Sequence, residues 1–138
     1  MPRLNRKAVR AFTLLESLLT LSVVCLLTLS LNGSVKAIFH QVERSLFLME
    51  LEHVYRETQR LSISQQQSLS LTVDTHTLEA PMGRYPIPKS IVPEQRVTVV
   101  FNPTGGNSSL AKIVFQTPEG KIKYQLYLGS GQYQKKTG

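Results

Sequence analysis

Hydrophobic and polar residues divide the chain into an apolar amino-terminal stretch and a longer polar part with short apolar alternations. The stretch from Phe12 to Leu31 is almost wholly apolar, and Glu16 is its one charged residue. Folded as an α-helix, these 20 residues would be about 30 Å long, which matches the hydrocarbon core of a bilayer. Hydroxyl groups within the stretch can hydrogen-bond back to the helix carbonyls. The pattern therefore predicts a membrane-spanning helix.

A second helical pattern follows a turn-like break at Asn32-Gly33-Ser34. From Val35 to about Arg60, apolar residues recur at intervals of three and four, and charged residues occupy much of the remaining surface. The apolar positions are Val35, Ile38, Phe39, Val42, Leu46 and Met49. Because this spacing places them on one side of a helix, we expect an amphipathic helix that packs this stripe on the core of a folded domain.

After Arg60 the period changes to the alternation expected of β-strands. A polar break at 64–67 ends the helical pattern, and the four prolines of 80–93 predict an irregular loop. Alternating segments occur at 69–73, 97–101, 111–116 and 121–128. The last two are joined by a hairpin at 117–120, and each has one apolar face, as in an antiparallel sheet that covers a helix. The predicted fold class is α+β: a long amino-terminal helix, half transmembrane and half amphipathic, packed on a small antiparallel β-sheet.

Charge supports the membrane assignment. The chain has 16 Lys and Arg against 9 Asp and Glu, a formal net charge of +7. Four basic residues precede Phe12, which leaves 12 basic against 9 acidic residues, a net of +3. These four are Arg3, Arg6, Lys7 and Arg10. A basic run before an apolar run is the usual signal that orients a membrane helix. The remaining charge favours nucleic-acid binding only slightly.

The junction between the basic and apolar runs carries a recognisable motif. The string Ala-Phe-Thr-Leu-Leu-Glu that begins at Ala11 resembles the class III signal of type IV pilins and pseudopilins. In that family a prepilin peptidase cuts after a small residue, before a Phe, and methylates the new amino terminus. A Glu follows as the fifth residue of the mature chain. The resemblance implies a leader at 1–11, cleavage between Ala11 and Phe12, and Glu16 as that acid. The family usually has Gly where Ala11 stands, and many of its members have Pro where Gly33 stands.

Glu16 has two interpretations. A charged side chain in a membrane helix costs a few kcal/mol, so it usually has a partner; alternatively, Glu16 lies near the membrane boundary and reaches water. After cleavage Phe12 would carry a new cationic amine. In a filament, this amine can meet the Glu16 carboxylate of a neighbouring subunit in an apolar medium, where the attraction is strong. Because losing one partner would strand a buried charge, such a pair would fix the register of assembly.

The carboxyl-terminal half resembles one particular group within the pilin family. The segments 105–112 and 124–129 are similar to those of the ComGD-type minor pilins of streptococcal competence systems. This resemblance implies a minor subunit of a competence pilus that takes up DNA during transformation, with other major and minor pilins, the prepilin peptidase and the membrane as partners. It implies a transmembrane assembly helix at 12–33 and a pilin head at 34–138, on the outer side of a single membrane span and on the cell surface after assembly. The nearest alternative is a type II secretion-like pseudopilin.

The residues offer little for catalysis. The three histidines, His40, His53 and His76, are far apart and have no metal-ligand spacing. The one cysteine, Cys25, lies in the apolar run and cannot form a disulfide within the chain. No nucleophile motif or phosphate-binding loop occurs, so we expect a chain that is not an enzyme and needs no metal or cofactor.

A cluster of lysines near the carboxyl end is a candidate DNA contact. Its members are Lys121, Lys123, Lys135 and Lys136, with Tyr127 and Tyr133 nearby. Lysines can meet phosphates and tyrosines can meet bases, which would make the chain a pilus subunit that binds DNA directly, though weakly. The alternative is a solvated strand face whose lysines protect a sheet edge.

Overall fold

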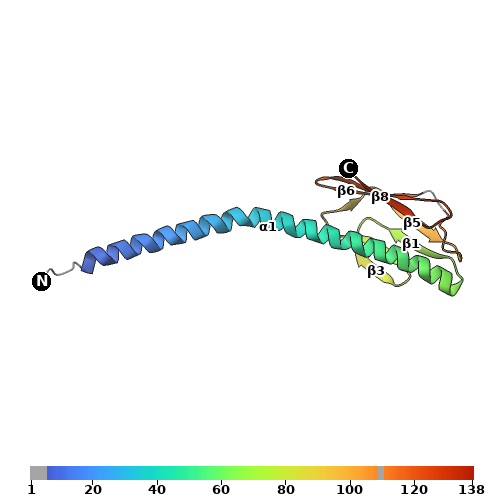
Figure 1. The fold of residues 1–138 in the computed structure, drawn as a ribbon, viewed down its shortest axis with the longest axis horizontal. Helices are drawn as coiled ribbons and strands as arrows, with labels where there is room; N and C mark the ends of the chain where they lie inside the picture. The colour runs from blue at the N-terminus through green and yellow to red at the C-terminus, as the bar shows by residue number, and fades with distance from the viewer. Residues whose placement is uncertain (1–5, 109–110) are drawn as a thin grey trace. The chain divides into compact units, whose positions relative to one another are not determined.

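A computed structural model describes residues 6–108 and 111–138, with side chains described from residue 13 onward. The chain forms a helix of 60 residues, α1 (Arg6–Gln65), followed by strands (Figure 1). It divides into two compact units, Met1–His40 and Gln41–Gly138. The first unit is helical wherever it is described, and the second contains the rest of α1 and the strands.

In the first unit, the exposed side chains of α1 are mostly apolar, and its hydroxyl groups hydrogen-bond to carbonyl groups of the same helix. Four hydroxyls donate to the carbonyl four residues earlier at 2.7–2.8 Å: those of Thr20, Ser22, Thr28 and Ser30. No polar group of these side chains therefore needs water, as a helix in lipid requires. Among the described residues α1 is the one helix long and apolar enough to cross a membrane.

The predicted break at Asn32-Gly33-Ser34 is wrong, because α1 continues through these residues. A glycine costs a helix only about 1 kcal/mol relative to alanine, and a long run of helical hydrogen bonds outweighs that cost. The helix ends instead at the predicted polar break. Gln66 has a φ of 52°, in the left-handed region, and the amide of Gln67 donates to the Ser62 carbonyl at 3.2 Å, which closes the last turn.

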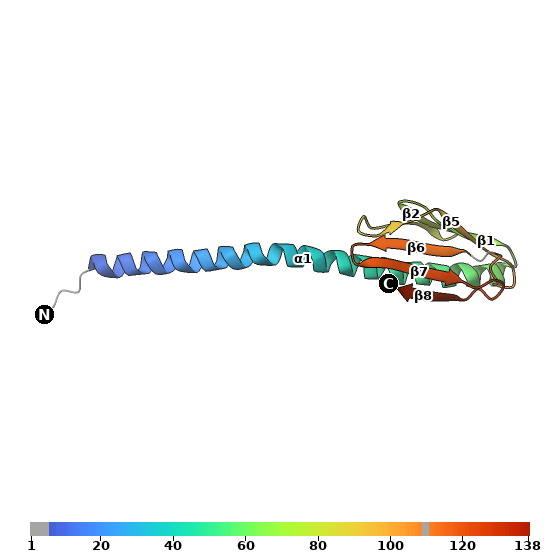
Figure 2. The same ribbon diagram turned by 90° about the horizontal axis from the view of Figure 1, so that it is seen from above.

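The strands of the second unit form two four-stranded antiparallel sheets (Figures 1 and 2). Sheet A has the order β3-β2-β1-β5, with β1 (Leu69–Val73), β2 (Thr77–Ala80), β3 (Gly83–Pro86) and β5 (Val97–Phe101). Sheet B has the order β4-β6-β7-β8, with β4 (Val92–Pro93), β6 (Lys112–Thr117), β7 (Gly120–Leu126) and β8 (Tyr133–Thr137). The α+β class with antiparallel strands beside a long helix is confirmed.

The four strands with clear alternation, β1, β5, β6 and β7, are confirmed, and so is the hairpin that joins β6 to β7. The remaining strands were not expected. The proline-rich segment 80–93 contains β3 and β4 instead of only irregular loop. Pro86 ends β3 and Pro93 ends β4, and both strands lie at sheet edges, where the missing proline donor costs least.

The core lies where both sheets meet the carboxyl-terminal part of α1. The helix contributes Phe47, Leu48, Leu51, Val54 and Tyr55, and the sheets contribute buried aliphatic and aromatic residues. Tyr55 makes edge contacts with Phe101 of β5 and Tyr133 of β8, at centroid distances of 4.9 and 5.1 Å. One helix residue therefore joins sheet A to sheet B, and such aromatic pairs add to the stability gained from burial.

The apolar stripe expected to pack on the core is exposed, so that prediction is wrong. Val35, Ile38 and Phe39 in the first unit, and Val42, Leu46 and Met49 in the second, all lie at the surface. Between residues 42 and 55 the helix is apolar on two sides, and both sides have helical spacing. The side that packs on the sheets also contains the buried polar residues Arg44, Thr58 and Ser62, which hid it from the sequence pattern.

Candidate functional site

Glu16 lies on the exposed surface of α1, in the first unit. It lies on one side of the helix with residues spaced three and four apart: Thr13, Ser17, Thr20, Leu21 and Val24. Its backbone carbonyl accepts the Thr20 hydroxyl at 2.8 Å, and its carboxylate has no ion-pair partner among the described side chains. The predicted cleavage residues Ala11 and Phe12 belong to the helical backbone, but their side chains lie outside the described part.

A second apolar surface lies on α1 within the second unit, and we call it the outer stripe. It consists of Val42, Leu46 and Met49, whose side chains are 51%, 61% and 67% exposed. Leu51, on the same helix, is 2% exposed because it faces the sheets. Grouped apolar side chains of this kind on a small domain mark an interaction site more often than an ordinary solvated surface.

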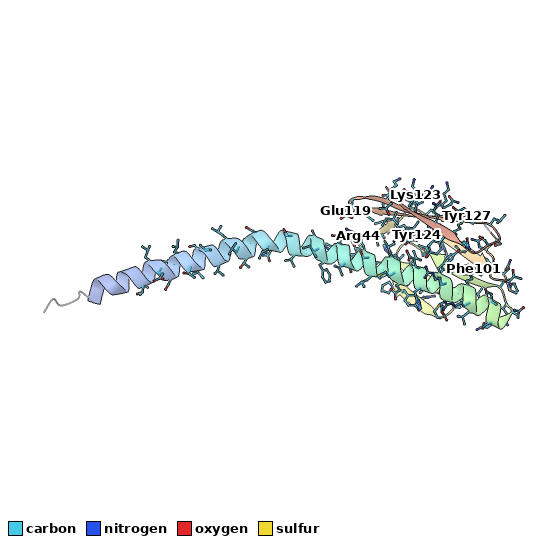
Figure 3. All side chains as sticks on the ribbon, viewed as in Figure 1. Arg44, Phe101, Glu119, Lys123, Tyr124 and Tyr127 are labelled. Carbon is cyan, nitrogen blue, oxygen red and sulfur yellow. The ribbon has the colours of Figure 1, made fainter. Side chains whose placement is uncertain are left out.

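The four predicted DNA-contacting lysines do not lie together. Lys121 and Lys123 of β7 and Lys136 of β8 are on the side of sheet B that faces away from α1, where Figure 3 shows Lys123. Lys135 is on the opposite side, which faces the helix. Its ammonium lies 3.3 Å from a Glu52 carboxylate oxygen and 5.8 Å from the centre of the Tyr124 ring. Lys135 therefore ties β8 to α1, and Tyr133 lies on this inner side with it.

The polar groups on the two sides of sheet B differ in character. On the inner side, the Tyr124 hydroxyl donates to Glu52 at 3.0 Å, and burial together with this carboxylate raises the pKa of Tyr124. On the outer side, hydrogen bonds from Lys121 and Gln116 lower the pKa of Glu94. The inner contacts hold the helix to the sheet, whereas the outer ones are open to solvent.

An ion pair that the sequence pattern did not reveal joins α1 to the hairpin between β6 and β7. Arg44 Nη2 donates to Glu119 Oε1 at 2.6 Å (Figure 3). The Arg44 side chain is 7% exposed, whereas that of Glu119 is 68% exposed. Because a buried guanidinium needs a partner, Glu119 fixes the hairpin against the helix. The residues are far apart in sequence, and only the fold brings them together.

The described side chains contain no group of three or more His, Cys, Asp or Glu residues that could hold a metal ion. His40 and His53 of α1 lie in different compact units, and His76 lies in the turn between β1 and β2. The functional candidates among the described residues are therefore surfaces: the side of α1 that contains Glu16, the outer stripe and the outer face of sheet B.

Comparison with known proteins identifies the family. The competence protein ComGD of Streptococcus pneumoniae is 45% identical over 130 residues, which cover 94% of this chain and 81% of the relative. The chain belongs to the ComGD family. No protein-family model and no solved structure matches it. As a ComGD-type competence pilin, it combines the helix and antiparallel sheets described above with the prepilin-like motif at Ala11.

Proposed function

We propose that this chain is a minor subunit of a competence pilus that takes up DNA during transformation. The observation that carries the proposal is the ComGD relative, with which the chain shares 45% identity over nearly its whole length. That relative is named a competence protein, and competence is the state in which a cell imports DNA. The role is structural: the subunit works by assembling with other major and minor pilins, and no chemical step is assigned to it.

Two features of the structure support an assembling subunit. The apolar surface of α1 in the first unit is long and apolar enough for a single membrane span. In this proposal, residues 34–138 form the head, on the outer side of that span. The outer stripe leaves Val42, Leu46 and Met49 half to two-thirds exposed, although burying the remaining surface of each would gain about 1–2 kcal/mol. Helices of neighbouring pilins would cover this stripe in a filament.

The processing and assembly residues belong to the same proposal. A prepilin peptidase removes the leader 1–11 by cutting between Ala11 and Phe12, and 12–33 then acts as the membrane and assembly helix. The carboxylate of Glu16 meets the Phe12 amine of a neighbouring subunit. This pairing is supported by the exposed position of Glu16, whose carboxylate has no ion-pair partner among the described side chains.

Deletion and complementation test the function. Deleting the gene should abolish transformation and the appearance of pili, and the wild-type gene should restore both. Glu16→Ala protein should be made and inserted at wild-type levels but be absent from sheared pili. Glu79→Ala removes a surface carboxylate from β2, away from the outer stripe, and is the control, which should enter pili normally.

Two results would contradict the proposal. Normal transformation in the deletion strain would refute the competence role, and loss of protein secretion in its place would indicate a type II secretion-like pseudopilin. Glu16→Ala protein at wild-type levels in purified pili would refute the pairing of Glu16 with the Phe12 amine while leaving the competence role intact.

A further inference from the structure

The positive charge of the chain after its leader is concentrated in the last third. Residues 12–94 contain 6 basic and 8 acidic residues, a net of −2, whereas residues 95–138 contain 6 basic residues and 1 acidic residue, a net of +5. The two values sum to the net of +3 that remains without the leader. Because 95–138 include β5 to β8, the excess is carried by one part of the head.

Strand geometry places most of this charge on one surface, which we call the lysine face. It consists of Lys112 of β6, Lys121 and Lys123 of β7, and Lys136 of β8, all exposed. Lys123 lies directly opposite Lys136 in the antiparallel pairing. Lys112 lies opposite Gln125, on the same side of the sheet as Lys123. The sequence pattern had missed Lys112 and had included Lys135, which faces the helix.

The lysine face is electrostatically unfavourable for the isolated protein. Like charges directly opposite each other on adjacent strands destabilise a sheet, as Lys123 and Lys136 do. Glu94 is the one carboxylate within 4 Å of these ammonium groups among the described residues, at 2.6 Å from Lys121 Nζ. Lys112, Lys123 and Lys136 have no ion-pair partner in the described part of the chain. The face therefore has unneutralised charge that an anionic ligand would relieve.

Neutral donors and an aromatic ring complete the surface. Gln116, Gln125 and Gln134 share the lysine face, and the Tyr127 hydroxyl donates to Gln134 at 2.9 Å. Amide groups hydrogen-bond phosphate and sugar oxygens without selecting a base. Lysines two apart on one strand are about 7 Å from each other, which is comparable with the distance between adjacent phosphates along one DNA strand. These groups suit a repeating phosphate backbone better than a single small anion.

We propose that the lysine face of sheet B is a nonspecific contact surface for the phosphate backbone of DNA. The proposal rests on the DNA-uptake function above, and deepens it by naming where this subunit touches its cargo. Because the face points away from α1, a subunit whose helix is covered by neighbouring pilins keeps the lysines free for DNA (Figures 2 and 3). Contacts from many subunits along one DNA molecule would add together.

The expected affinity is weak and strongly dependent on salt. Four lysines neutralise at most four phosphates, so the slope of log K against log salt concentration is about −3.6 or shallower. Raising salt from 50 to 200 mM would then weaken binding by up to about 150-fold. Each lysine replaced by Gln should make the slope shallower by about 0.9.

The test uses the full chain purified in a neutral detergent and a fluorescent double-stranded DNA fragment, with binding measured over a series of salt concentrations. The doubly substituted variant K123Q/K136Q should have a slope shallower by about 1.8. The control R84Q/K89Q removes the same charge from exposed positions in and after β3, and its slope should stay at the wild-type value. Equal losses in the two variants would overturn the proposal, because net charge alone would then explain the binding.

Experiments in cells separate this proposal from the proposed function. The fourfold variant K112Q/K121Q/K123Q/K136Q should enter pili at wild-type levels while DNA binding and transformation fall. If this variant binds DNA and transforms normally while the deletion strain does not transform, the lysine face is refuted and the competence role stands. If the variant instead loses binding to anionic lipid vesicles but keeps binding to DNA, the face contacts a membrane surface and the proposal is overturned.

Discussion

Two leucines of α1, five positions apart, differ in burial, so truncating each to alanine should affect different properties of the protein. Leu51 is 2% exposed in the core between α1 and the sheets, and Leu46 is 61% exposed on the outer stripe. Changing each to Ala removes the same atoms from the same helix. Leu51→Ala should therefore destabilise the folded head, whereas Leu46→Ala should leave it intact and act on assembly.

The magnitudes follow from burial. Truncating a buried leucine costs about 2–5 kcal/mol, because transfer energy is lost and a cavity remains. In a unit of about 100 residues, 1 kcal/mol corresponds to about 4–8 °C in Tm, so Leu51→Ala should lower the Tm by at least about 10 °C. An exposed truncation changes stability by less than about 0.5 kcal/mol, so Leu46→Ala should lower the Tm by no more than about 4 °C.

The assay has two readouts. Near-ultraviolet circular dichroism of the processed protein in detergent gives the Tm, since the tyrosines of the core report its packing. Immunoblots of sheared pili give incorporation, which Leu46→Glu should reduce at least about tenfold by placing a charge on a surface that neighbours cover. Equal Tm losses for the two alanine variants would refute the burial argument. Normal incorporation of Leu46→Glu would refute the outer stripe as an assembly surface.

Three further measurements test other parts of the structure. The intact mass of membrane-extracted protein should correspond to a chain that lacks 1–11 and begins at a methylated Phe12; a chain retaining the leader would refute the processing. Burial raises the pKa of Tyr55 from 10.0 to about 12, so stability should fall between pH 10 and 12, where only the unfolded tyrosine ionises. The part of this loss that Tyr55 causes is about 3 kcal/mol at most, and Tyr55→Phe should remove that part. The part caused by Tyr124, whose pKa is also raised, should remain. Glu119→Ala should cost about 1–2 kcal/mol by stranding the buried Arg44, and adding Arg44→Met should recover most of it in a denaturation series.

Local periodicity was enough to predict the helix and four of the strands. Alternation at 69–73, for example, reflects side chains that fall in turn on the core and on solvent, and β1 occupies these residues. Strand β8 has no such signal, because Tyr133-Gln-Lys-Lys-Thr is polar throughout. It forms because β7 offers an edge and Tyr133 packs between Tyr55 and Tyr124, which are contacts from distant parts of the chain.

The candidate site was also predictable only where its signal is local in the sequence. The prepilin-like motif is a run of adjacent residues, so it could be read directly. Assigning the lysines to a surface required the strands first: once β8 is known, alternation puts Lys135 and Lys136 on opposite sides of the sheet. The exposed stripe could not be told from the core stripe by spacing, because a helical period identifies a side of a helix but not what covers it.

In the proposed assembly, the outer stripe and Glu16 would have different roles: the stripe would provide affinity between subunits, and Glu16 would fix their register. Covering Val42, Leu46 and Met49 would contribute several kcal/mol at about 25 cal/mol per Å² of apolar surface, before the cost of ordering the subunits is subtracted. That contribution does not depend strongly on direction, so a neighbouring helix sliding by one turn would lose little of it. An ion pair between Glu16 and the Phe12 amine in an apolar medium loses most of its energy when the partners separate by a few Å. The stripe would therefore supply affinity without register, and Glu16 would supply the register that a subunit needs to enter the filament. Replacing Glu16 should block incorporation into pili while leaving the affinity between heads nearly unchanged.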